Sequence, residues 1–112
     1  MKRIQLPLTK DVIQSLRVGD KVYLNGPMFT GRDAAHRRLV ESLERGEDLP
    51  IPLDGSTIFY VGPSPARPGQ IIGSAGPTTS YRMDDYTPRL LEEGLLGMIG
   101  KGRRSPHVRR AI

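Results

Sequence analysis

Residues 31–45 read GRDAAHRRLVESLER, and residues 57–61 read TIFYV. In the first stretch the apolar side chains recur at helical spacing (Ala35, Leu39, Val40 and Leu43), and Gly46 suits the position that ends a helix. The second stretch is short and rich in β-branched and aromatic residues, as buried strands are. A helix that leads into a strand is the repeating unit of α/β proteins, so these residues indicate that class.

The same alternation extends in both directions along the chain. Towards the amino terminus we expect a helical turn over residues 9–16, with Thr9 as its cap, and a half-buried strand over residues 21–25. Towards the carboxyl terminus the expected elements are a turn-forming loop over 62–69, a strand over 70–74, a helix over 85–93 ended by Gly94, and a strand over 95–99.

Length and charge limit the class of protein. With 112 residues, 37% of them hydrophobic, the chain fits one domain over residues 1–112 with a thin aliphatic core. The formal net charge is +5, but residues 101–112 carry five of the seventeen Lys and Arg and no acidic residue. The remainder is close to neutral, unlike the basic surface of a protein that tracks nucleic acid. We expect residues 103–112 to be a solvated, frayed tail.

Cysteine usage and hydropathy exclude several further classes. The chain contains no cysteine, which excludes disulfides and any thiolate-held zinc or iron–sulfur cluster in this chain alone. Its two histidines, His36 and His107, are far apart and form no metal-binding motif. No apolar run reaches the length of a membrane span, and the first residues lack the character of a signal peptide. We expect a cytoplasmic protein that does not bind a membrane.

One candidate anion site lies where the long helix is expected to begin. The first amides of a helix have no partner inside it and carry partial positive charge. Arg32 adds a guanidinium that can bind a carboxylate through two hydrogen bonds, and His36 follows one turn later on the same face. The structural alternative is an ordinary capped helix with Arg32 in solvent and His36 half-buried.

Two more loops combine glycine with polar groups and a cation. In residues 76–82 the hydroxyls of Thr78, Thr79 and the following Ser80 precede Arg82, and together they can surround an anion. Hydroxyl side chains also favour helix caps, which is the structural alternative. Further on, Gly100 and Gly102 flank Lys101, so that a ligand can approach backbone and ammonium closely. A surface turn explains the same residues.

Taken in order, these segments resemble the β region of class I iron–sulfur fumarate hydratases and L(+)-tartrate dehydratases. The segments that carry the resemblance are Gly19-Asp20 with Val22 and Leu24, TGRDAAH at 30–36, YVGP at 60–63, GPTTS at 76–80, RMD at 82–84 and MIGKG at 98–102. They span nearly the whole chain. The form of residues 30–36 is closer to the fumarate hydratase branch.

The resemblance implies a fold, a partner and a cofactor. It implies a swivelling domain of β/β/α layers with a mixed sheet, which forms a hetero-oligomer with an α subunit. That partner, and not this chain, is implied to hold a [4Fe–4S] cluster on three cysteines. The family's β region continues beyond the Gly-Lys-Gly loop, whereas this chain ends at Ile112, so the resemblance also implies an incomplete domain.

The resemblance further implies the role of each candidate residue. Arg32, Arg82 and Lys101 would clamp a dicarboxylate, fumarate or (S)-malate, with Thr79 and His36 assisting, and Thr78 would take part in proton transfer at the reacting carbon. Three alternatives remain: the β subunit of a tartrate dehydratase, a non-catalytic module that binds anions or nucleic acid through the basic tail, and a truncated remnant.

Overall fold

The structure is a computed structural model that describes residues 1–62 and 65–112. Its strands are β1 (Lys2–Gln5), β2 (Val22–Asn25), β3 (Phe29–Thr30), β4 (Thr57–Phe59) and β5 (Gly97–Ile99). Its helices are α1 (Lys10–Ser15), α2 (Asp33–Arg45), α3 (Thr87–Glu92), α4 (Pro106–Ala111) and the short 3₁₀ helix η1 (Ser80–Met83). The predicted α/β class is confirmed. Of the turn-forming loop expected over residues 62–69, Pro63 and Ser64 lie outside the described residues.

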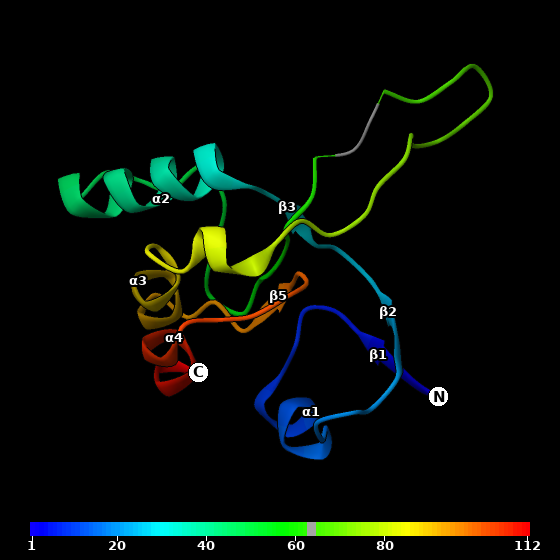
Figure 1. Cartoon of the computed structure of the whole chain (residues 1–112), viewed down its shortest axis with the longest axis horizontal. Helices are drawn as coiled ribbons and strands as arrows, with labels where there is room; N and C mark the ends of the chain where they lie inside the picture. The colour runs from blue at the N-terminus through cyan, green and yellow to red at the C-terminus, as the bar shows by residue number, and fades with distance from the viewer. Residues whose placement is uncertain (63–64) are drawn as a thin grey trace.

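The strands form two small parallel sheets (Figure 1). One pairs β1 with β2, and the other has the order β3-β4-β5, with Ile58 of β4 opposite Phe29 on one side and Met98 on the other. Parallel neighbours need a crossover connection, and α2 supplies it between β3 and β4, as η1 and α3 do between β4 and β5. The mixed sheet implied by the resemblance is therefore not found among the described strands, whose pairs are all parallel.

Local signals place the helices close to their predicted positions. The hydroxyl of Thr9 accepts a hydrogen bond from the amide of Val12 at the start of α1, as a cap does. Helix α2 ends at Gly46, whose φ of 68° is the left-handed conformation that glycine adopts without strain. Pro88 lies in the first turn of α3, where its missing N–H costs nothing.

The strand expected over residues 70–74 is wrong. These residues are irregular in the structure, and the two isoleucines that suggested a strand, Ile71 and Ile72, are exposed. A turn closed by Arg67 and Gln70 precedes them, and no described strand pairs with them. In Figure 1 the stretch of residues 65–75 extends away from the sheets. β-Branched residues favour a strand only where a neighbouring strand and a buried face are present.

The hydrophobic core lies between the β3-β4-β5 sheet and the helices α2 and α3. It consists of aliphatic residues with one Tyr: Leu39, Leu53, Ile58, Tyr60, Met83, Leu90 and Leu95.

In the described part of the chain, no helix is both long and apolar enough to cross a membrane.

The carboxyl-terminal residues do not form a frayed tail. Residues Pro106–Ala111 form α4, which contacts α3, and the side chain of Val108 is completely buried. Arg104 is also largely buried, and its guanidinium pairs with the carboxylate of Asp84. The charge of this segment favoured a solvated tail. The burial of Val108 and the ion pair of Arg104 with Asp84 instead hold the segment against the fold.

We predict that Val108→Ala lowers the free energy of unfolding by about 2 kcal/mol, because it removes buried methyl groups and leaves a cavity. Arg109→Ala, an exposed neighbour on the same helix, is the matched control and should change the free energy by less than about 0.5 kcal/mol. Denaturant unfolding measures both. Equal, small changes would mean that α4 is not docked.

Candidate anion-binding site

The predicted loops meet at one edge of the three-stranded sheet. The strands β3, β4 and β5 are parallel, so their carboxyl ends lie at the same edge, and ligands of open α/β sheets bind beyond that edge. Arg32 follows β3, and Lys101 follows β5. The amide of Gly31 donates to the carbonyl of Phe59 (3.0 Å), which extends the pairing of β3 with β4 up to Arg32.

The second loop joins this edge through its backbone. The amide of Thr78 donates to the carbonyl of Tyr60 (2.7 Å), and the amide of Ser80 donates to the carbonyl of Lys101 (2.7 Å). The amide of Lys101 returns a longer bond to the carbonyl of Thr78 (3.3 Å), and Thr79 forms a parallel bridge with Lys101. The hydroxyl-rich loop and the Gly-Lys-Gly loop, 20 residues apart in sequence, are therefore held side by side.

An open hollow lies at the amino terminus of α2. Its volume is about 430 Å³, and it is lined by the two guanidinium side chains and the first turn of the helix: Arg32, Asp33, Ala34, Ala35 and Arg82. The first amides of a helix point out of its amino-terminal end and attract anions. The hollow thus combines a helix terminus with two cations from distant parts of the sequence.

The guanidinium of Arg32 lies directly against the backbone of Gly62. A Cβ atom at position 62 would meet the Cζ of Arg32 at 2.6 Å and its Nε at 2.7 Å. Glycine is therefore required here for close approach, since no side-chain atom fits between the two. No hydrogen bond or ion pair of the Arg32 guanidinium occurs among the described residues.

Arg82 already holds a carboxylate in this structure. One of its terminal nitrogens lies 2.5 Å from Oδ2 of Asp33, in a pair whose side chains are 49% and 43% exposed. The other oxygen, Oδ1 of Asp33, is buried and has no partner within residues 1–62 and 65–112. Exposed ion pairs are weak, so a ligand carboxylate can compete with Asp33 for Arg82.

Lys101, Thr78 and Thr79 lie at the same edge but do not line this hollow. Lys101 is exposed, and the two threonines are half-buried. Neither the ammonium of Lys101 nor the hydroxyl of Thr78 has a hydrogen-bond partner in the described part of the chain. The structure therefore brings the predicted residues together as two groups, one around Arg32 and Arg82 and one around Lys101, joined by the segment that contains Thr78 and Arg82.

His36 is not among the residues that line this hollow, and its predicted part in substrate binding stays a prediction. It is completely buried, and its ring meets that of Tyr60 edge-on, with the centroids 5.2 Å apart. Its Nδ1 lies 2.9 Å from the carbonyl oxygen of Arg32, so Nδ1 is the protonated donor. Burial lowers the pKa of His36. The hydrogen bond to the carbonyl of Arg32 opposes this effect in part, and the nearby charge of Arg104 lowers the pKa again. His36 is therefore a neutral support for the backbone of Arg32.

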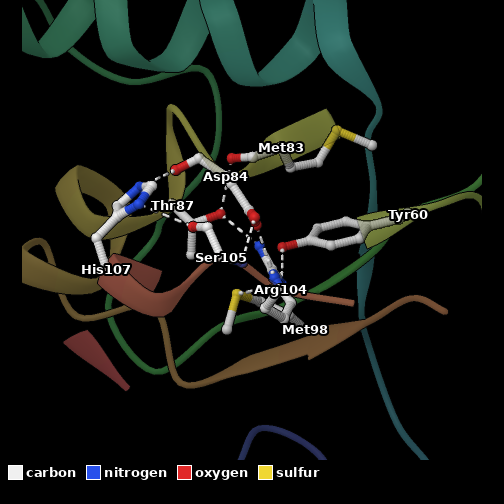
Figure 2. Close-up of polar contacts among 8 residues, drawn as sticks. All are labelled: Tyr60, Met83, Asp84, Thr87, Met98, Arg104, Ser105 and His107. Carbon is white, nitrogen blue, oxygen red and sulfur yellow. Dashed lines mark hydrogen bonds and ion pairs between the residues drawn. The ribbon is translucent and has the colours of Figure 1, made fainter. Parts of the chain in front are cut away.

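Sequence analysis missed the buried polar network beneath the second and third loops (Figure 2). The guanidinium of Arg104 pairs with Asp84 (2.9 Å) and also reaches the hydroxyls of Tyr60 (3.1 Å) and Thr87 (2.8 Å). Arg104 was counted as one charge of the tail. The sequence carried no signal for this network, because the burial of Asp84, which makes a cationic partner necessary, is seen only in the structure.

The ligand set of an iron–sulfur cluster does not fit this chain. Such clusters are held by cysteine thiolates, and the sequence has none. In the described residues, no group of three histidine or acidic side chains offers a substitute. The described residues therefore offer no ligands for such a cluster, whereas the loops at the sheet edge offer cations, amides and hydroxyls.

The buried state of His36 predicts a dependence of stability on pH. Because folding lowers its pKa below the ordinary value of about 6.5, the unfolded chain binds the proton more readily. The stability is therefore fully present above about pH 6.5 and is lost as the pH falls towards the lower, folded pKa. We expect His36→Gln to flatten the free energy of unfolding between about pH 7 and pH 5. An unchanged slope in that variant would contradict a buried, neutral His36.

Known proteins contain a similar segment. Residues 1–112 match the family described as the fumarase C-terminus. The chain is 40% identical over 102 residues to the class I aerobic fumarate hydratase of Salmonella typhimurium strain LT2, an alignment that covers 88% of this chain and 18% of that protein. It is 41% identical over 92 residues to the class I aerobic fumarate hydratase of Escherichia coli strain K12, covering 81% and 17%.

A second kind of relative is named for a different substrate. The chain is 40% identical over 110 residues to the L(+)-tartrate dehydratase subunit beta of Escherichia coli strain K12, covering 95% of this chain and 53% of that subunit. The chain thus spans about half the length of the tartrate dehydratase subunit and less than a fifth of the fumarate hydratases. Because the family match extends over all 112 residues, the chain belongs to the fumarase C-terminus family.

Proposed function

We propose that this chain supplies the dicarboxylate-binding loops of a hydro-lyase that interconverts fumarate and (S)-malate, acting with a partner subunit that carries a [4Fe–4S] cluster. The observation that carries the proposal is the hollow in which Arg32 and Arg82 meet the amino terminus of α2. The names of its relatives, which are hydro-lyases of fumarate and of tartrate, support the reaction class.

The charges of the loops suit a substrate with two carboxylates. Arg32 and the helix amides can bind one carboxylate, and Lys101, on the neighbouring loop, can bind the other. When the substrate binds, its carboxylate either replaces that of Asp33 at the guanidinium of Arg82 or binds beside it. Cations on separate loops fix both ends of a small acid, which orients its central carbons for reaction.

Proton transfer is assigned to Thr78. Its backbone is fixed on both sides, by Tyr60 and by Lys101, which holds the residue at the edge where the cations lie. A threonine hydroxyl is a poor base without a neighbour that takes its proton, and the partner chain has to supply that group. Negative charge that develops beside a substrate carboxylate as its proton leaves is stabilised by the fixed Arg and Lys side chains.

Tartrate is the second candidate substrate, because the relative that aligns with 95% of this chain is named a tartrate dehydratase subunit. Both substrates are four-carbon dicarboxylates, and both need the same cations. A panel of fumarate, (S)-malate and L(+)-tartrate, assayed with one reconstituted complex, separates the two readings. Nucleic-acid binding is less favoured, since Arg104 and Val108 of the basic segment are buried in the fold.

The test is anaerobic reconstitution with a cluster-bearing α subunit of this family, followed by an assay of fumarate hydration. We expect the wild-type complex to turn over. Arg82→Ala should lower kcat/KM, and the ratio to wild type should correspond to a loss of about 2–3 kcal/mol of transition-state stabilisation, as for loss of a charge-assisted contact. Arg45→Ala, an exposed arginine at the far end of α2, is the matched control and should leave kcat/KM unchanged. Equal activity of Arg82→Ala and wild type would remove Arg82 from the site.

Gly62→Ala tests the position of Arg32 without changing any charge. The new methyl group would overlap the guanidinium, and because this is the end of a flexible side chain, Arg32 should move away while the fold persists. We expect a rise in KM of about tenfold, close to that of Arg32→Ala, and an unchanged melting temperature. If KM stays at the wild-type value, Arg32 does not bind substrate from the place it occupies here.

A further inference from the structure

The guanidinium of Arg104 lies where three segments of the fold meet. Nε contacts Asp84 just after η1, Nη1 contacts Tyr60 just after β4, and Nη2 contacts Thr87 in α3. The same group lies over the Tyr60 ring, with 5.4 Å from Cζ to the centroid. The side chain is only 15% exposed, and that of its partner Asp84 is 7% exposed. Figure 2 shows these side chains directed towards the guanidinium.

Two of these contacts, and Arg104 itself, are one short step from a residue of the proposed site. Asp84 follows Arg82 by two residues. The carbonyl of Tyr60 accepts the hydrogen bond that fixes Thr78. Arg104 itself follows Lys101 by three residues, and the adjoining Ser105 donates its amide to Asp84 (2.7 Å). One buried cation therefore connects the backbone segments that present Arg82, Thr78 and Lys101.

The arrangement needs an arginine and not merely a positive charge. A guanidinium donates in fixed directions within one plane, so it can hold a carboxylate and two hydroxyls at once. A lysine ammonium on a flexible chain keeps the charge but cannot reach all three acceptors in the same geometry. A buried ion pair adds little net stability compared with apolar packing, and its larger contribution is often to fix one conformation.

We propose that Arg104 is a positioning residue for the dicarboxylate site, which sets the relative placement of Arg82, Thr78 and Lys101. The inference rests on the proposed function of those three residues. Arg104 does not touch the substrate in this account. It acts through Asp84 and Tyr60, so its loss should be seen in substrate binding and turnover before it is seen in folding.

The test compares Arg104→Lys with Val108→Ala in the reconstituted complex. Both variants change buried side chains of the same carboxyl-terminal segment, but Val108 is completely buried and makes no contact with the proposed site residues through hydrogen bonds. We expect Arg104→Lys to raise KM for the dicarboxylate at least about tenfold and to lower kcat, because displaced catalytic groups lose rate steeply. Val108→Ala should keep the wild-type kcat and KM, although its melting temperature should fall as much as that of Arg104→Lys or more.

If Arg104→Lys does not fold, a second variant still tests the positioning role. Tyr60→Phe removes only the hydroxyl that Arg104 contacts and keeps the ring in the core. It should raise KM by a smaller factor, about threefold, with little change in melting temperature.

The outcomes separate this inference from the proposed function. One outcome is that turnover is lost in Arg82→Ala but stays at the wild-type level in both Arg104→Lys and Tyr60→Phe. This outcome would overturn the positioning role of Arg104 and leave the proposed function in place. The same would follow if Val108→Ala lost as much activity as Arg104→Lys at the same melting temperature, since Arg104 would then only stabilise the fold. A wild-type complex that neither binds nor converts any of the dicarboxylates would overturn the proposed function, and the positioning role with it.

Discussion

The placement of the candidate site depends on the contacts of one buried residue, Tyr60. Its amide donates to Ile99 at the end of β5, and its carbonyl accepts from Thr78. Its ring packs against His36 of α2, and its hydroxyl accepts from Arg104. The backbone joins two loops, and the side chain joins the long helix to the carboxyl-terminal segment. Because interiors are close-packed, these partners cannot shift independently of one another.

The close approach of these loops also depends on glycine. A Cβ atom at Gly100 would lie 2.6 Å from the Cδ2 of Tyr60, and a Cβ atom at Gly62 would overlap the guanidinium of Arg32. Both glycines have ordinary backbone angles, so they are needed for space and not for conformation. The two glycines have no side chain, and this lets the sheet edge, the helix terminus and the cations lie close together.

The distribution of charge also differs from the first impression given by the sequence. The net charge of +5 is concentrated in residues 101–112, but Arg104 of that segment is neutralised inside the fold by Asp84. Within residues 1–62 and 65–112, Arg32 and Lys101 are cations at the sheet edge that have no acidic partner, and they lie in separate loops. A small anion with two charged ends fits such an arrangement better than a continuous polyanion does.

Elements with strong local signals could be predicted from the sequence, whereas elements set by distant partners could not. The helix α2 and its end at Gly46 follow from periodicity and from the left-handed conformation that glycine allows. Strand β3 has only two residues and exists because β4 pairs with it, which no local pattern reveals. The apolar pair Ile71 and Ile72 favoured a strand that has no partner.

The same distinction holds for the site. Arg32, Thr78, Arg82 and Lys101 were predicted as site residues because each lies in a loop with a recognisable combination of glycine, hydroxyl and cation, and their binding of a ligand stays a prediction. The burial of His36 depends on Tyr60, and the role of Arg104 depends on Asp84, 20 residues away. Sequence spacing carries no information on such contacts.

The most direct test of the account is a titration of the ¹⁵N-labelled chain with succinate, an unreactive four-carbon dicarboxylate, with acetate for comparison, followed by amide chemical shifts. The account predicts shifts confined to residues 31–35, 78–82 and 100–102, and saturation at a lower concentration of succinate than of acetate. Shifts centred on the exposed Arg109 and Arg110 of α4, with equal response to the two acids, would contradict it, because the loops would then not form one dicarboxylate site.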